Sequence, residues 1–100
     1  MNDNKKYVEA IAKMLEEQGA YKYFEEDDPL DIEWTLDYTM HFRGANVAVT
    51  LGGPNVYINT FHGNVDLYWG NEEEHAYLSV RCRDELNDYF EELFNMISGC

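Results

Sequence analysis

The chain has 100 residues, which fits one domain, and its 45% hydrophobic and 15% aromatic residues are enough to form a packed core. These aromatic residues exclude a disordered acidic tail. The 20 Asp and Glu against 7 Lys and Arg give a formal net charge of −13, which argues against docking on an anionic lipid surface.

The sequence also predicts a cellular compartment. It has no apolar run of about 18 residues, so we expect no membrane span. The first residues lead into an amphipathic segment rather than an apolar one, so we expect no secretory signal. Cys82 and Cys100 are the only cysteines, and two cysteines do not make a disulfide framework. We therefore expect a cytoplasmic protein with no membrane partner.

The N-terminal segment is predicted to be a helix over residues 4–18. Its apolar residues Val8, Ile11 and Leu15 repeat at helical spacing, and Gly19 is placed to end it. Residues 20–31 are predicted to be a connector, because Pro29 prevents a helix from running through.

A period of two then predicts strands. Apolar and polar residues alternate over residues 32–42, and the alternation resumes over 47–51, 56–60 and 65–69. The predicted turns are residues 43–46, 52–55 and 62–64. Residues 70–74 are predicted to be an exposed acidic loop, followed by a short edge piece over residues 75–78.

A final helix is predicted over residues 80–97, with Ser79 as its N-cap. Its buried stripe is predicted to contain Cys82, Leu86, Tyr89, Phe90, Leu93 and Ile97. The prediction is thus a single α+β domain over residues 1–100, with an N-terminal helix, a four-stranded antiparallel meander and a C-terminal helix. Both helices are expected on one sheet face, which leaves the other face open.

The negative charge is concentrated in the middle of the chain. Between Lys22 and Arg81 the only cation is Arg43, against 11 acidic residues, which gives a formal charge of −10. Unneutralised carboxylates raise self-repulsion in the compact state. A basic partner surface is the leading reason for a fold to retain them.

The predicted long strand places carboxylates in a row. Asp31, Glu33 and Asp37 lie opposite the apolar face, and residues on one strand face repeat every ~6.6 Å. This spacing is on the order of that between phosphates of a nucleic acid, so such a row is suited to a groove that binds DNA.

The final helix has acidic residues opposite its apolar stripe and no cation after Arg83. Its like-charge pairs four residues apart are unfavourable, although a merely solvated acidic face is the alternative interpretation. The candidate partner-binding residues are Glu25, Glu26, Asp27, Asp28, Asp31, Glu33, Asp37, Glu72, Glu73, Glu74, Asp84, Asp88 and Glu91.

Aromatic residues are expected on the polar faces of the strands. If Leu67 and Trp69 face the core, then Tyr57, Phe61 and Tyr68 face outwards. Outward tyrosines suit recognition of a basic partner, although tyrosines also populate strands for structural reasons.

The sequence offers little catalytic or metal-binding chemistry. His41, His62 and His75 lack metal-ligand spacing, and Pro29 and the missing loop glycine argue against a calcium loop at the acidic residues 27–33. No nucleophile elbow, phosphate loop or dinucleotide fingerprint is present. We expect no enzyme, no cofactor and no metal.

The element order over residues 4–97 and the carboxylate-rich surface resemble small phage-encoded anti-CRISPR proteins. This resemblance implies a non-enzymatic inhibitor in a phage-infected or lysogenic bacterial cell. It would bind the nucleic-acid-binding surface of a CRISPR effector as a DNA mimic, without binding nucleic acid itself. The alternative is an immunity protein or an antitoxin-type module that binds another basic protein.

Overall fold

The computed structural model describes residues 3–97, so Cys100 lies outside the described residues. The elements, in chain order, are α1 (Asp3–Gln18), α2 (Ala20–Glu26), β1 (Asp31–Leu36), β2 (Phe42–Thr50), β3 (Asn55–Asn59), β4 (Asn64–Trp69), β5 (Glu72–Tyr77) and α3 (Val80–Ile97). Each strand pairs antiparallel with the next one along the chain. The predicted α+β class and meander are confirmed, but the described sheet has five strands rather than four.

Helix α1 confirms the predicted N-terminal helix. Val8, Ile11 and Leu15 are buried, and Gly19 follows the helix with φ 84°, a left-handed conformation that favours glycine. The Gly19 N–H donates to the Leu15 carbonyl at 2.9 Å, which ends α1 in a sharp turn.

Helix α2 replaces the first part of the predicted connector over residues 20–31, so that prediction is wrong. A seven-residue helix is marginal on its own, and this one is held by burial of Ala20, Tyr23 and Phe24. Its first turn is capped from a distance, because the Ala20 N–H donates to Glu85 Oε1 of α3 at 3.0 Å. No residue next to Ala20 signals this cap.

The predicted strand over residues 32–42 is divided by a turn after β1. Asp37 Oδ1 accepts hydrogen bonds from the backbone N–H groups of Thr39 and His41, at 2.9 and 3.0 Å, and Met40 has φ 69°. A side chain that bonds the nearby backbone in this way competes with the strand ladder. The predicted turn at 43–46 therefore lies inside β2.

The predicted acidic loop over residues 70–74 is wrong beyond Asn71. The chain turns at residues 70–71, where Gly70 has φ 61°, and β5 then pairs with β4 from Trp69↔Glu72 to Asn64↔Tyr77. Trp69 was expected in the core, but it lies at this end of β4 and is 54% exposed. The two other predicted turns are confirmed in position, at residues 52–54 and 60–63, but Asn55 and Asn64 already belong to β3 and β4.

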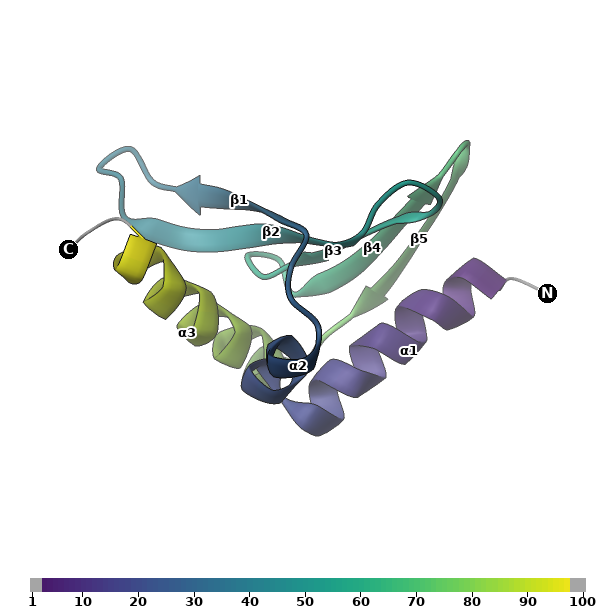
Figure 1. Ribbon diagram of the computed structural model, residues 1–100, viewed down its shortest axis with the longest axis horizontal. Helices are drawn as coiled ribbons and strands as arrows, with labels where there is room; N and C mark the ends of the chain where they lie inside the picture. The colour runs from purple at the N-terminus through teal and green to yellow at the C-terminus, as the bar shows by residue number, and fades with distance from the viewer. Residues whose placement is uncertain (1–2, 98–100) are drawn as a thin grey trace.

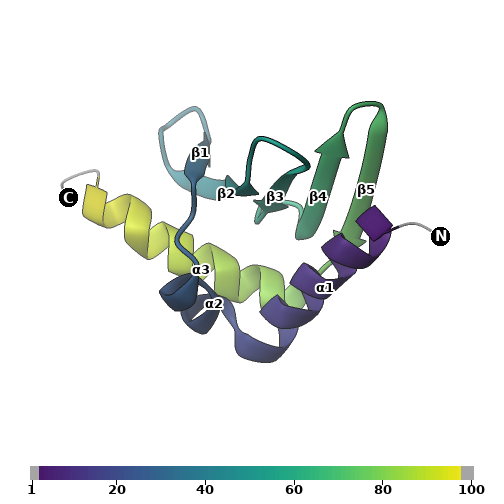
Figure 2. The same ribbon diagram turned by 45° about the vertical axis from the view of Figure 1, so that its right-hand side comes forward.

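One face of the sheet packs on the helices. Val47, Ile58, Val65 and Ala76 form a cross-strand row of buried side chains on this face. Figures 1 and 2 both show α1, α2 and α3 on the same side of the sheet. The other side is covered by no helix of the described chain, as predicted, and we call it the open face.

Helix α3 begins as predicted. Ser79 Oγ accepts a hydrogen bond from the Cys82 N–H at 3.1 Å, and Cys82, Leu86 and Phe90 are buried. Ile97 was expected in the buried stripe but is 62% exposed. It lies beyond Phe94, the last residue of α3 whose ring packs against Trp34 and Phe42 of the sheet.

Candidate functional site

The predicted carboxylate row on β1 is shorter than expected. Asp31 and Glu33 are exposed on the open face, where they pair in register with Ala48 and Asn46 of β2. Asp37 does not continue the row, because it lies in the turn after β1. Its hydrogen bonds from the Thr39 side chain and the His41 backbone lower the pKa of its carboxyl group. Asp37 therefore stabilises a turn.

The three glutamates of β5 do not form one patch. Successive strand residues point to opposite faces, so Glu73 shares the open face with Tyr68, whereas Glu74 pairs with the inward-facing Leu67. Glu72 Oε1 accepts a hydrogen bond from Asn4 Nδ2 of α1 at 2.8 Å. Only Glu73 of this group belongs to the open face.

The remaining candidate acids lie on the helix side of the molecule. Glu25 and Glu26 end α2, Asp27 and Asp28 follow it, and all four are exposed. Asp84, Asp88 and Glu91 are exposed along α3. The predicted residues are therefore divided between the two faces, and no single surface presents them all.

Several acids that were not candidates bind the chain itself. Glu16 of α1 accepts the Ser79 N–H at 2.6 Å and the Ser79 hydroxyl at 2.8 Å, and the backbone hydrogen bond is the main reason that the pKa of Glu16 is lowered. Glu85 caps α2, and Glu92 accepts the Tyr21 hydroxyl at 2.9 Å. Part of the acidic excess on the helices thus stabilises the fold.

The open face carries two cross-strand rows of mostly polar residues, of which the sequence singled out only Asp31, Glu33 and Tyr57 as surface residues for binding. The first row runs Glu33, Asn46, Asn59, Asn64, Tyr77, and the second runs Asp31, Ala48, Tyr57, Asp66, His75. Part of the sequence signal for these rows was available, because most of their residues alternate with apolar residues that pack in the core. Their alignment depends on strand register, which the sequence did not give.

Of the three aromatic residues predicted to face outwards from the strands, two lie on the open face. Tyr57 and Tyr68 lie there with their ring centroids 6.1 Å apart. Phe61 lies in the turn after β3, where its ring centroid is 5.0 Å from that of His62. Phe61 therefore belongs to the end of the sheet rather than to the face.

A hydrogen-bonded network fixes the side of the open face formed by β4 and β5. Asp66 is 7% exposed, and its Oδ1 accepts a hydrogen bond from Asn64 Nδ2 and lies 2.6 Å from His75 Nδ1. His75 Nε2 lies 3.1 Å from Glu73 Oε1. The hydrogen bonds to Asp66 and then to Glu73 raise the pKa of His75. An imidazolium that forms there is held between two carboxylates.

The open face therefore presents amides, phenols and carboxylates on rigid strands. These groups donate and accept hydrogen bonds, which suits recognition. Among residues 3–97, no group of three or more His, Cys, Asp or Glu side chains is arranged to hold a metal ion, and none of the described helices is long and apolar enough to cross a membrane. No protein-family model, curated protein or solved structure matches the chain.

Proposed function

We propose that this chain is a non-enzymatic binding protein whose open face binds a basic protein surface. The observation that carries the proposal is the first cross-strand row, in which three asparagines lie between Glu33 at one sheet edge and Tyr77 at the other. Asparagine and tyrosine are both enriched in the binding loops of antibodies, where tyrosine supplies contact area and asparagine supplies adaptable hydrogen bonds.

The carboxylates at the two edges of the open face favour a positively charged partner. Asp31 and Glu33 lie on β1, one edge strand, and Glu73 lies on β5, the other. Carboxylates at the rim of an interface steer a cationic partner and fix its register more than they add affinity. The acids of α2 and α3 lie on the helix side, so they contribute to the long-range field rather than to contacts with the same partner surface.

The narrower form of the proposal is a DNA mimic that occupies the nucleic-acid-binding surface of a bacterial CRISPR effector. The net charge of −13 and the two carboxylates of β1, ~6.6 Å apart on one face, support it. In this form the contacting carboxylates are Asp31, Glu33 and Glu73, and Asp37 is excluded by its turn.

A second candidate is an immunity protein or antitoxin-type module that neutralises a basic protein. The observation that favours it is the amide and phenol content of the open face between its acidic edges. Such groups complement a folded protein surface with mixed donors and acceptors, whereas a channel for nucleic acid mainly offers cations to phosphates.

Capture from a bacterial lysate tests the proposal with two variants that remove the same charge. Asp31→Asn with Glu33→Gln alters the open face, and Glu25→Gln with Glu26→Gln alters the exposed end of α2. We expect the wild type and the α2 variant to retain a basic protein at about 50 mM salt, and the open-face variant to lose it. Equal capture by all three proteins would contradict the proposal.

Competition with duplex DNA separates the two forms. If the captured protein is released by added DNA, its nucleic-acid-binding surface is occupied and the mimic is supported. If the capture depends on Asp31 and Glu33 but resists DNA, the antitoxin-type module is supported instead.

A further inference from the structure

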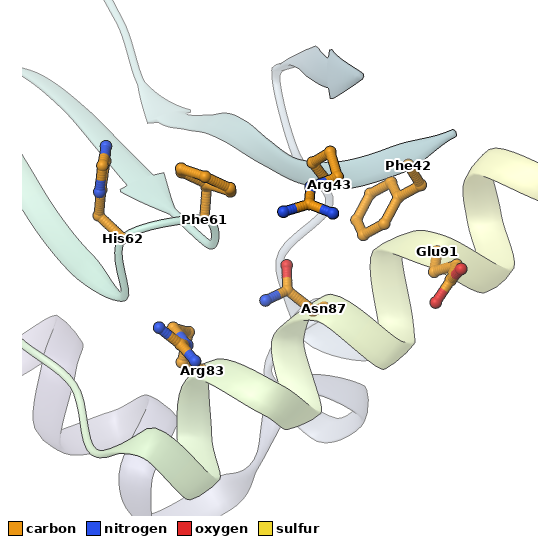
Figure 3. A pocket seen from close by; sticks show the side chains of 7 residues that line it. All are labelled: Phe42, Arg43, Phe61, His62, Arg83, Asn87 and Glu91. Carbon is orange, nitrogen blue, oxygen red and sulfur yellow. The ribbon is translucent and has the colours of Figure 1, made fainter. Parts of the chain in front are cut away.

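A cleft at one end of the sheet gathers cations in this acidic molecule. It has a volume of about 570 Å³ and lies between the start of β2, the turn after β3 and helix α3. Figure 3 shows Arg43 on β2, His62 in the turn and Arg83 on α3 around this space. Phe42 and Phe61 also line it. The volume falls within the ~300–1,000 Å³ that is typical of small-molecule sites.

The charge of this cleft differs from that of the rest of the chain. Two of the three arginines in the sequence line it, against a net charge of −13 for the whole chain. Within residues 3–97, Arg43 forms no ion pair, and Arg83 has only an exposed contact with Asp84 at 3.7 Å. Neither guanidinium is neutralised by a close, buried carboxylate.

A β-bulge places Arg43 at the cleft. Thr35 of β1 pairs with Gly44 and Leu36 pairs with Phe42, so Arg43 is the extra residue between them. Bulges redirect side chains and occur often beside functional sites. Here the bulge leaves Phe42 packed on Trp34 and Phe94, and Figure 3 shows the Arg43 guanidinium directed toward α3.

The Arg83 side chain packs against Gly63, where a larger residue would leave it no room. A Cβ atom at Gly63, where φ is 80°, would lie 2.9 Å from Arg83 Cδ and 3.1 Å from its Cγ. The Arg83 stem therefore packs closely under the turn. Arg83 Nε is buried and has no hydrogen-bond partner among residues 3–97. Buried donors are nearly always paired, so this guanidinium has hydrogen-bonding capacity that the protein does not use.

Asn87, which lines the cleft, is held by hydrogen bonds to the turn after β3. Thr60 is fully buried, its hydroxyl donates to Asn87 Oδ1 at 2.7 Å, and Asn87 Nδ2 donates to the Thr60 carbonyl at 3.0 Å. The Ala45 N–H donates to Thr60 Oγ1 at 2.9 Å. These bonds join β2, the turn and α3, so the cleft is formed before any ligand binds.

The backbone at Phe61, which also lines the cleft, is fixed by its close contact with Gly44 of β2. A Cβ atom at Gly44 would lie 2.6 Å from Phe61 Cβ and 2.9 Å from its Cα, so the backbone of β2 and the turn touch here. Only glycine permits this approach. The Phe61 ring thus offers a partly exposed apolar wall beside the two arginines.

We propose that this cleft binds a small organic phosphate. Guanidinium groups match phosphate oxygens with paired, charge-assisted hydrogen bonds. Arg43 and Arg83 reach the cleft from different elements, and a phosphate offers oxygens in several directions. The organic part packs on Phe61. Glu91 also lines the cleft, where its carboxylate accepts a hydrogen bond from a hydroxyl or amine group of the ligand. Its negative charge disfavours a ligand with a second anionic group at that position.

Titration calorimetry with adenosine monophosphate, adenosine and inorganic phosphate tests this site. We expect the monophosphate to bind more tightly than either of the other probes. Equal binding of adenosine and its monophosphate would overturn the phosphate contact. Inorganic phosphate binding as tightly as the monophosphate would overturn the contact with an organic part.

Matched arginine variants test whether the monophosphate binds in this cleft. Arg43→Gln and Arg83→Gln should each weaken the monophosphate about tenfold or more, which is the usual effect of losing one charged contact. Arg81→Gln removes the same charge from α3 outside the cleft and should change binding less than about twofold. If all three variants bind alike, the cleft is not the site. Arg43 is exposed, so its variant keeps the test valid even if Arg83→Gln does not fold.

Discussion

Carboxylates on the helix side of the molecule and those at the β1 edge of the open face differ in their hydrogen bonds to the protein. On the helix side, Glu16 and Glu85 accept backbone N–H groups at the starts of α3 and α2. On the open face, the side-chain carboxylates of Asp31 and Glu33 accept no hydrogen bond from residues 3–97, although their backbones pair with β2. Net charge alone therefore does not identify a binding surface, because some of the acidic side chains cap helices.

Removal of the Glu16 carboxylate should have the largest effect on stability. Glu16→Ala loses both hydrogen bonds to Ser79, so we expect the free energy of unfolding to fall by about 1–2 kcal/mol. Glu17→Ala, at the exposed neighbouring position, should change it by less than about 0.5 kcal/mol. Urea unfolding at pH 7 measures both values, and similar losses in the two variants would show that Glu16 is not a cap.

The pH dependence sharpens this prediction. The folded pKa of Glu16 is lower than the unfolded value of 4.5. Its contribution is therefore present above pH 4.5 and is lost as the pH falls through the folded pKa. The difference in the free energy of unfolding between wild type and Glu16→Ala should therefore shrink as the pH is lowered below 4.5.

Removal of the Glu85 carboxylate should have a somewhat smaller effect. Glu85→Ala leaves the Ala20 N–H without its acceptor, and we expect a loss of about 1 kcal/mol and faster hydrogen exchange of the Ala20 amide. Asp88→Ala removes an exposed charge from the same helix and should leave that exchange rate unchanged. Unchanged exchange in Glu85→Ala would show that α2 does not depend on this cap.

The His75 network predicts a pH dependence of the opposite sign on the open face. Its folded pKa is raised above the unfolded value of 6.5, so its stabilisation is complete below pH 6.5 and is lost as the pH rises through the folded pKa. The free energy of unfolding of the wild type should fall over that range more than that of His75→Gln. Parallel pH profiles for the two proteins would contradict the contact with Asp66.

The sequence predicted the elements whose signals are local. The apolar stripe before Gly19 predicted α1, and Ser79 predicted the start of α3. The alternation with glycine-containing turns predicted β3 and β4. Helix α2 could not be predicted, because its cap comes from Glu85, 65 residues away along the chain.

The strand boundaries failed for a different reason. Alternation continues through residues 37–41 although Asp37 folds them into a turn, and three consecutive glutamates have low strand propensity although β5 pairs with β4. Both outcomes depend on tertiary contacts. The candidate site depends on them as well, because the asparagine row on the open face exists only in this register.

The smallest expected change in stability tests the central claim that the β1 carboxylates of the open face serve binding and not folding. Urea unfolding of the Asp31→Asn, Glu33→Gln double variant should give a free energy of unfolding equal to that of the wild type within about 0.5 kcal/mol, or slightly higher because self-repulsion falls. A loss of about 1 kcal/mol or more, as expected for a cap such as Glu85, would show that these carboxylates also stabilise the fold and would contradict the claim.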